Sequence, residues 1–184
     1  LTLPVQVGLT AFNPMIPLEV DDSSLPVAIF RYSLTNRSAS PVDLALAFSI
    51  LNPIGYDGHS PLGGNRFAGF GQNVTRVRRD ASIVGLDLTS QKYEPDDIRA
   101  GSMALVTTHP EVSARPAWEE GAWWDSFQKW FDEYAADGTF DQDGSAGPSA
   151  DGVSQHATLA PRFSLAPGES KAIVFLLAWH FPLR

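Results

Sequence analysis

The stretch from Ala28 to Leu51, AIFRYSLTNRSASPVDLALAFSIL, predicts two β-strands separated by a polar turn. Apolar residues recur at every second position in Ala28–Thr35 and again in Val42–Leu51, which is the period of a half-buried strand. Between them, four of the six residues of Asn36–Pro41 are turn formers, and the other two are an arginine and an alanine. We therefore expect an antiparallel hairpin. The expected core-facing positions are Ala28, Phe30, Tyr32 and Leu34 in the first strand, and Val42, Leu44, Leu46, Phe48 and Ile50 in the second.

Strand signals recur along the rest of the chain, separated by short Gly- and Pro-containing turns. Further strands are predicted at Val5–Phe12, Val74–Arg78, Ser82–Thr89, Gly101–Thr108, Thr158–Leu165 and Ser170–Trp179. About eight short strands with one helix predict a mainly β fold, an antiparallel two-sheet β-sandwich, as a single domain over residues 1–184. Ser170–Trp179 is apolar on both faces, which predicts a central strand. Pro167-Gly168 before it predicts a type II turn.

One segment has helical rather than strand periodicity. From Trp123, aromatic residues follow at steps of four, seven, eight and eleven, which predicts an amphipathic helix that ends at Asp137-Gly138. Such a stripe favours packing on a sheet. The alternative is a carbohydrate-binding module, in which Trp118 and Trp124, off the stripe, stack on a sugar.

Two long loops complete the organisation. Asn52–Gly71 holds six of the 15 glycines and predicts a structured loop, of a length that is often functional. Residues 137–155 have almost no apolar content, so we expect a mobile loop there.

Composition excludes several function classes. The net charge of −8 argues against an electrostatic nucleic-acid binder, and the absence of cysteine excludes disulfides and thiolate sites. No apolar run reaches the roughly 18 residues of a transmembrane helix. Histidine spacing and loop motifs predict no metal site and no cofactor. The chain starts at Leu1 without a leader, so we expect a fragment of a longer protein, with the compartment open and the cytoplasm favoured.

The acidic cluster PLEVDDSSLPV, Pro17–Val27, is the first candidate for catalysis. Two of its carboxylates could flank a sugar as in a glycosidase. However, Asp and Ser beside Pro are turn formers whose side chains bond nearby backbone N–H groups. With no nucleophile motif elsewhere, we predict no catalytic residues in this chain. The three acidic residues of the cluster are Glu19, Asp21 and Asp22.

Three stretches together resemble the N-terminal domain of glycoside hydrolase family 116, the family of bile-acid β-glucosidase and non-lysosomal glucosylceramidase. They are AFNPMIPLEVDDSSLPVAIFRYSLTN (Ala11–Asn36), PVDLALAFSILNPIG (Pro41–Gly55) and LAPGESKAIVFLLAWHFP (Leu165–Pro182). They occur in the family's order and, with the aromatic helix, extend the resemblance over most of the chain.

The resemblance implies a two-domain retaining β-glycosidase whose Glu nucleophile and Asp acid/base belong to a C-terminal (α/α) barrel. This chain would then be an accessory domain whose partner is that barrel, with a β-glucoside or glycolipid substrate near the interface. It also implies strands upstream of Leu1. We expect loops rich in Gly, Pro and aromatic residues to form the interdomain interface. The residues expected there are Ser24, Leu25, Pro26, Asn52, Gly55 and Phe70.

Overall fold

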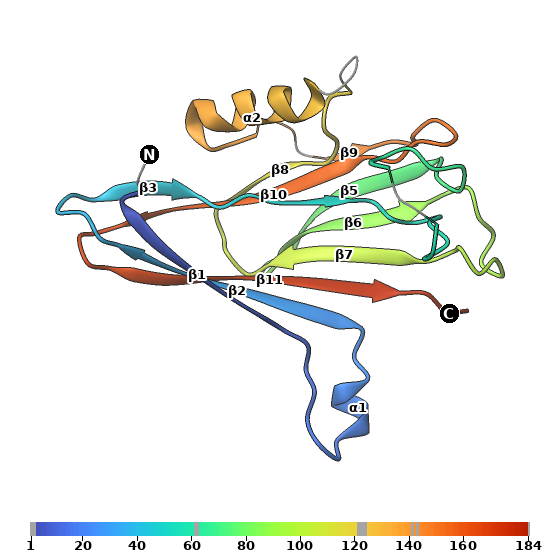
Figure 1. The fold of residues 1–184 in the computed structure, drawn as a ribbon, viewed down its shortest axis with the longest axis horizontal. Coiled ribbons are helices and arrows are strands. Elements are labelled where there is room, and N and C mark those ends of the chain that lie inside the picture. The colour runs from blue at the N-terminus through green and yellow to red at the C-terminus, as the bar shows by residue number, and fades with distance from the viewer. Residues whose placement is uncertain (1–2, 61–62, 121–124, 141, 143, 184) are drawn as a thin grey trace.

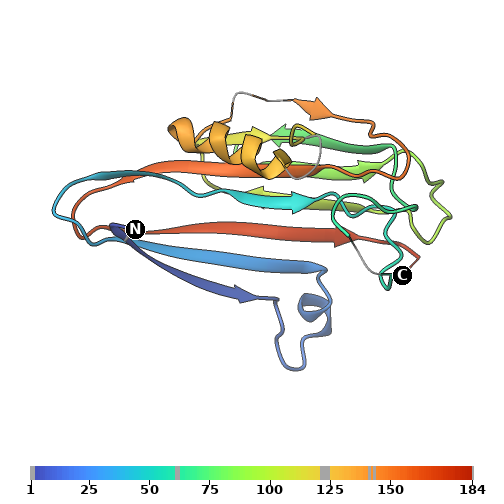
Figure 2. The same cartoon turned by 45° about the horizontal axis from the view of Figure 1, so that its top comes forward.

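The computed structural model describes residues 3–60, 63–120, 125–140, 142 and 144–183, and they form a two-layer β-sandwich (Figures 1 and 2). The large sheet has seven antiparallel strands in the order β1-β2-β11-β7-β6-β5-β9. Its strands are β1 (Val5–Phe12), β2 (Val27–Asn36), β11 (Ser170–His180), β7 (Ser102–Thr107), β6 (Val84–Ser90), β5 (Asn73–Arg79) and β9 (Ser145–Ala146). The predicted fold class, mainly β with two antiparallel sheets, is confirmed.

The small sheet is built around one long strand, β10 (His156–Leu165). One side of β10 pairs with β3 (Val42–Ala45) and β4 (Phe48–Leu51), and β8 (Val112–Arg115) also pairs with it. The single strand predicted over Val42–Leu51 is thus interrupted between β3 and β4. Because the small sheet is narrower than the large one, the first strands of the large sheet extend beyond it.

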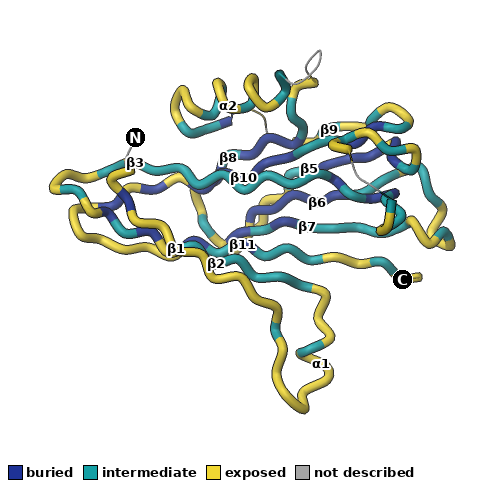
Figure 3. The backbone as a smooth tube through the Cα atoms, viewed as in Figure 1, coloured by how far each residue is buried: buried dark blue, intermediate teal, exposed yellow. Residues whose placement is uncertain are grey.

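The hydrophobic core lies between the two sheets (Figure 3). Phe48 of the small sheet packs on Phe30 and Phe175 of the large sheet, with ring centroids 5.2 and 5.1 Å apart. Leu105, Leu159 and their neighbours are fully buried around these rings. The alternation predicted for the two quoted strands is confirmed at eight of the nine expected core-facing positions, the exception being Ala28.

The predicted hairpin between the two quoted strands is wrong. β2 pairs with β1 and β11 in the large sheet, while β3 pairs with β10 in the small sheet. Each strand has one apolar face, and crossing between the sheets lets the two faces pack against each other instead of lying side by side. Asn36, 0% exposed, holds the crossing: its amide donates to the carbonyls of Ser40 (2.8 Å) and Leu165 (3.0 Å).

The central position predicted for β11 is confirmed, since it lies between β2 and β7. The turn before it is also as expected. Gly168 has φ of +75°, and Glu169 N donates to Ala166 O at 3.0 Å. This is the hydrogen bond and the left-handed third residue of a type II turn.

The aromatic helix is α2 (Asp125–Asp137), and it covers the outer face of the small sheet over β8 and β10 (Figure 1). Trp123, which opens the predicted stripe, lies outside the described residues. The loop expected to be mobile after α2 is held in place: β9 pairs with β5, and Phe140 and Val153 are buried. No helix among the described residues is long and apolar enough to cross a membrane.

Candidate interdomain surface

The chain between β1 and β2 leaves the sheet and forms a projecting arm, Asn13–Pro26 (Figures 1 and 2). The arm contains one short helical turn, α1 (Val20–Ser23). Ser23 closes it, because its hydroxyl accepts from Ile16 N (2.9 Å) and donates to Ile16 O (3.0 Å). Ser24 donates to Asp21 O at 2.9 Å. The serines in the acidic cluster therefore shape the arm, as turn chemistry predicts.

The arm exposes a group of large apolar side chains that a folded chain usually buries. Leu18 is 100% exposed, and Met15, Val20, Leu25 and Ile16 are 78, 77, 53 and 46% exposed. We call these five residues the apolar tip. They occur within eleven positions of one another, and none of them belongs to the core cluster. A group of exposed large apolar side chains on a projecting segment is typical of a protein-binding surface.

Leu18 also has a left-handed backbone, with φ of +71°. This conformation costs an L-residue with a Cβ roughly 1 kcal/mol. Glycine would adopt this conformation freely. A fully exposed leucine there is therefore unfavourable for two reasons, the strained backbone and the apolar side chain left in water. Glu19, Asp21 and Asp22 follow it closely in the sequence and are exposed, and we call these three residues the acidic border of the tip.

The base of the arm touches the end of β11. Trp179 N donates to Pro26 O at 3.0 Å. Pro26, Met103, Trp179 and Phe181 line an apolar depression of about 570 Å³ together with His180. The predicted interface residues Ser24, Leu25 and Pro26 are all exposed beside this depression. Arm and depression form one continuous candidate surface at the start of β2.

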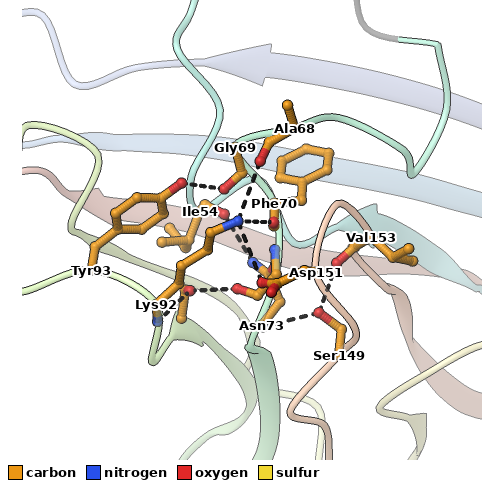
Figure 4. A network of polar contacts seen from close by, with 12 residues as sticks. Ile54, Ala68, Gly69, Phe70, Asn73, Lys92, Tyr93, Ser149, Asp151 and Val153 are labelled. Atoms are coloured by element: carbon orange, nitrogen blue, oxygen red, sulfur yellow. Dashed lines mark hydrogen bonds and ion pairs between the residues drawn. The ribbon is translucent and has the colours of Figure 1, made fainter.

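The 52–71 loop, unlike the arm, is attached to the rest of the domain by hydrogen bonds to buried side chains (Figure 4). Asn52 is 0% exposed, and its amide donates to Val74 O (3.2 Å) and Thr89 O (3.0 Å). Its Oδ1 accepts from Ile54 N and from the side chain of Asn73, both at 3.2 Å. All of the hydrogen-bonding capacity of this buried amide is thus used within the domain.

Asn73, also 0% exposed, completes the pair. Its amide donates to Ile54 O at 2.9 Å, and its Oδ1 accepts from Gly71 N at 2.9 Å. Lys92 reaches across to the same loop and donates to Ala68 O (3.2 Å) and Phe70 O (2.7 Å). The loop is thereby attached to β5 and to the segment after β6 (Figure 4).

Of the residues predicted in this loop, Asn52, Gly55 and Phe70 are all buried. Gly55 has φ of +100°, and a Cβ there would lie 2.4 Å from Gly69 O. Phe70 packs edge-on against Phe67, 5.5 Å between centroids. The six predicted interface residues therefore separate into three exposed on the arm and three that shape the loop from inside.

The aromatic residues around α2 stack on one another. Trp118 stacks on Trp130 (5.0 Å, 20°) and on His156 (4.9 Å, 28°). The indole N–H groups of Trp118 and Trp130 both donate to Thr158 Oγ1, at 2.9 and 3.0 Å. Burial lowers the pKa of His156 below its ordinary value of 6.5, because the charged form loses its hydration. Trp118 is thus engaged in packing, and Trp124, its expected companion, lies outside the described residues.

Comparison with known families shows the family to which the chain belongs. The model of the N-terminal domain of glycosyl-hydrolase family 116, described as beta-glucosidase 2, matches residues 2–184. The chain belongs to this family. The resemblance inferred from the three sequence stretches is confirmed.

A solved structure described as a putative kojibiose phosphorylase from human microbiome is also similar to this family 116 N-terminal domain. It is 11% identical with a TM-score of 0.42, and the match covers 96% of this chain. This chain spans 16% of the length of that protein.

Sequence reasoning named one residue of the apolar tip of this family 116 domain, Leu25, and missed the other four. The pattern that marks the tip in PLEVDDSSLPV is large apolar residues that alternate with acidic residues in a loop. Met15, Leu18 and Val20 have no period of two or of 3.6 that would place them in a strand or helix. Apolar residues without a periodic partner are the pattern that could have predicted the exposed tip.

Proposed function

We propose that this chain is the non-catalytic N-terminal accessory domain of a β-glucosidase-like glycoside hydrolase, and that its arm docks on the C-terminal catalytic domain. The observation that carries the proposal is the apolar tip, with Leu18 fully exposed on a strained backbone. Burial of such side chains in a partner groove contributes about 25 cal/mol for each Å² removed from water.

Family membership supports the identity of the partner, since the matching model describes the N-terminal part of a β-glucosidase family. The end of β11 supports the location, because Trp179 and His180 lie beside Pro26 at the base of the arm. Any polypeptide that continues from β11 would start next to the arm and the apolar depression. The docked domain would be the helical (α/α) barrel, which would supply the catalytic Glu and Asp.

The acidic border indicates what the groove contains. Glu19, Asp21 and Asp22 would face Lys or Arg residues around an apolar centre, which is the usual arrangement of an apolar core with a charged rim. A β-glucoside or glycolipid substrate would bind close to this interface, on the catalytic side.

The test uses the longer enzyme that contains this domain. Leu18→Asp places a charge in the proposed apolar contact, so we expect the two domains to separate and hydrolysis of an aryl β-glucoside to fall at least about tenfold. The readouts are kcat/KM and the rate of limited proteolysis between the domains. The matched control is Ile83→Asp, which charges another exposed apolar side chain on the turn before β6, four strands away from β1.

Unchanged activity and unchanged proteolysis in Leu18→Asp would refute docking through the arm. Hydrolysis by the 184-residue chain alone would refute the non-catalytic assignment and return attention to Glu19, Asp21 and Asp22.

A further inference from the structure

The outer face of the large sheet is not covered by any helix or strand that the structure describes. The core lies against its inner face, and α2 covers the small sheet on the opposite side of the molecule (Figures 1 and 2). An antiparallel sheet with one face in the core and the other in water usually alternates apolar and polar residues along each strand. The outward-facing residues should therefore be polar along the whole length of the strands.

The end of this face that lies away from the arm follows the rule. In β2 the outward-facing residues Ser33 and Arg31 are exposed, and the exposed Thr10 of β1 lies opposite Arg31. The hydroxyl groups of Thr35 and Ser170 form a hydrogen bond of 2.8 Å between β2 and β11. These side chains suit contact with water, and we call this part of the face the polar end.

The end of the face nearer the arm breaks the rule. The register sets two apolar rows across the sheet there, one from β1 to β7 and the other, beside it, from β2 to β7. We call these seven residues the outer apolar patch. The first row is Phe12, Ile29, Leu176 and Val106, and the second row is Val27, Ala178 and Ala104. Phe12 is 49% exposed and the other six are partly exposed, so the patch is open to a partner.

The outer apolar patch has a charged border on one side and the arm on the other. Beyond β7, in β6, Asp87 lies opposite Ala104 and pairs with Arg78 at 3.5 Å. On the opposite side, Phe12 is the last residue of β1 and Val27 is the first residue of β2, so the arm begins and ends at the patch. The patch and the arm are therefore neighbouring surfaces.

We propose that the outer apolar patch is a second docking surface of this domain, and that its occupant is the C-terminal catalytic domain that receives the arm. The identity of the partner rests on the proposed function, whereas the face that it covers follows from the patch. The course of the chain supports the same partner. β11 ends at His180, two residues after Ala178, so the chain leaves the large sheet beside the patch and not at the polar end.

The composition of the patch suits a permanent partner. Interfaces that stay closed are more apolar than interfaces that open and close. The patch contains no polar side chain, and the charges of Arg78 and Asp87 lie at its border, which is the usual arrangement of an apolar centre and a charged rim. Ala104 and Ala178 are small, so the backbone of a partner can approach the sheet closely along the second row.

Two other occupants account for less. Strands upstream of Leu1 would pair with β1 and extend the large sheet in its own plane, which leaves the outer face uncovered. A second copy of this chain would cover the patch and leave the arm of each copy without a partner. A single downstream domain covers both exposed apolar surfaces.

The experiment measures how fast single cysteines react with iodoacetamide in the longer enzyme. This domain has no cysteine of its own, and mass spectrometry of the peptide assigns the label to the introduced thiol. Leu176→Cys and Ala178→Cys should react at least about tenfold more slowly than Ala136→Cys, the matched control at an exposed position of α2. One patch variant removes volume and the other adds a single atom, so agreement between them excludes crowding as the cause.

Separation of the domains should remove the protection. After limited proteolysis between the domains and isolation of the N-terminal fragment, both patch cysteines should react at least about tenfold faster than before. Ala157→Cys, at a position of β10 that is 0% exposed, should stay unreactive, which shows that the fragment is still folded.

Three results would overturn the proposal. Patch cysteines as reactive as Ala136→Cys in the intact enzyme would show that the face is open to water. Protection lost on dilution would assign the face to a second copy, and protection that persists in the isolated fragment would assign it to a segment of that fragment. Leu18→Cys tests the arm separately in the same enzyme. A reactive Leu18→Cys with protected patch cysteines would refute arm docking and support the patch, and the reverse would refute the patch alone.

Discussion

The arm and the 52–71 loop are both irregular segments between strands, yet their apolar and polar groups are placed in opposite ways. In the loop, Asn52 and Phe70 are fully buried, and side chains outside the loop donate to the loop's backbone carbonyls of Ile54 and Phe70. In the arm, Leu18 is fully exposed, and the bonds that the side chains of Ser23 and Ser24 form are local to the arm itself. The loop is stabilised by its own domain, and the arm holds its shape while leaving its apolar surface open.

The comparison shows that an irregular segment rich in Gly and Pro can have either of two roles, stabilising its own domain or binding a partner. A long loop with many internal bonds is part of the core and determines stability. A short arm with exposed apolar residues contributes little to stability and is available to a partner. Substitutions in the loop should therefore lower the free energy of unfolding, and substitutions in the arm should leave it unchanged or raise it.

The largest effect is expected for Asn73→Ala. The substitution leaves Asn52 Oδ1, Ile54 O and Gly71 N without their Asn73 partner in a buried site, and each unsatisfied group costs about 1–3 kcal/mol. We expect the free energy of unfolding to fall by about 3 kcal/mol, measured by urea denaturation. A loss below about 1 kcal/mol would show that the Asn52–Asn73 pair does not anchor the loop.

Gly55→Ala should have the next largest effect. The new Cβ would lie 2.4 Å from Gly69 O, and φ of +100° strains any residue with a Cβ. We expect a loss of about 2 kcal/mol in unfolding free energy. Gly64→Ala, also at positive φ but with nothing within 4 Å of the Cβ position, is the matched control. Equal losses in the two variants would assign the effect to backbone strain alone.

Leu18→Gly should act in the opposite direction. Glycine relieves the left-handed backbone at φ of +71° and removes a fully exposed leucine, so we expect a gain of up to about 1 kcal/mol in the isolated domain. In the longer enzyme the same substitution should weaken interdomain docking. Thermal unfolding of both proteins measures the two effects. Destabilisation of the isolated domain would mean that Leu18 supports the arm rather than a partner.

The smallest effect concerns pH and the aromatic stack. Burial lowers the pKa of His156 below 6.5, so well above pH 6.5 the residue is neutral in both the folded and the unfolded state and does not affect stability. As pH falls from 6.5 toward the folded-state pKa, the unfolded chain binds the proton first and the folded state loses stability. His156→Gln should flatten this part of the stability profile. Because burial also lowers the pKa of His109, His109→Gln should flatten the same part of the profile, and the two variants together should flatten it more than either one alone. An unchanged profile in His156→Gln would place the titration elsewhere.

The strands were predictable because their core faces are apolar at every second position. β1 was predicted with its observed ends, and the helix was predicted to end where α2 ends. The partner of each strand was less accessible. Nothing in residues 36–41 distinguishes a hairpin turn from a crossing between sheets, since the decisive contact is with Leu165, 129 positions away.

The missed elements, α1, β8 and β9, have only two to four residues each. β9, Ser145–Ala146, is a strand only because it pairs with β5, and no local sequence pattern predicts a strand of two residues. For the candidate site, Ser24, Leu25 and Pro26 were predicted from the sequence, but the exposure of Leu18 was not. Exposure depends on what the rest of the fold leaves uncovered, which no local window contains.

The buried amide of Asn36 has a consequence for the order in which the chain folds. The β2–β11 ladder starts beside it at Thr35 opposite Ser170, and the β3–β10 ladder starts at Val42 opposite Leu165. Both sheets therefore extend from the same corner, and that corner closes a loop of more than one hundred residues. Closing so long a loop is slow, because its entropy is lost before the ladders form. Once the corner has closed, each ladder can add one residue pair after another. The contact between Asn36 and Leu165 should therefore limit the folding rate of both sheets.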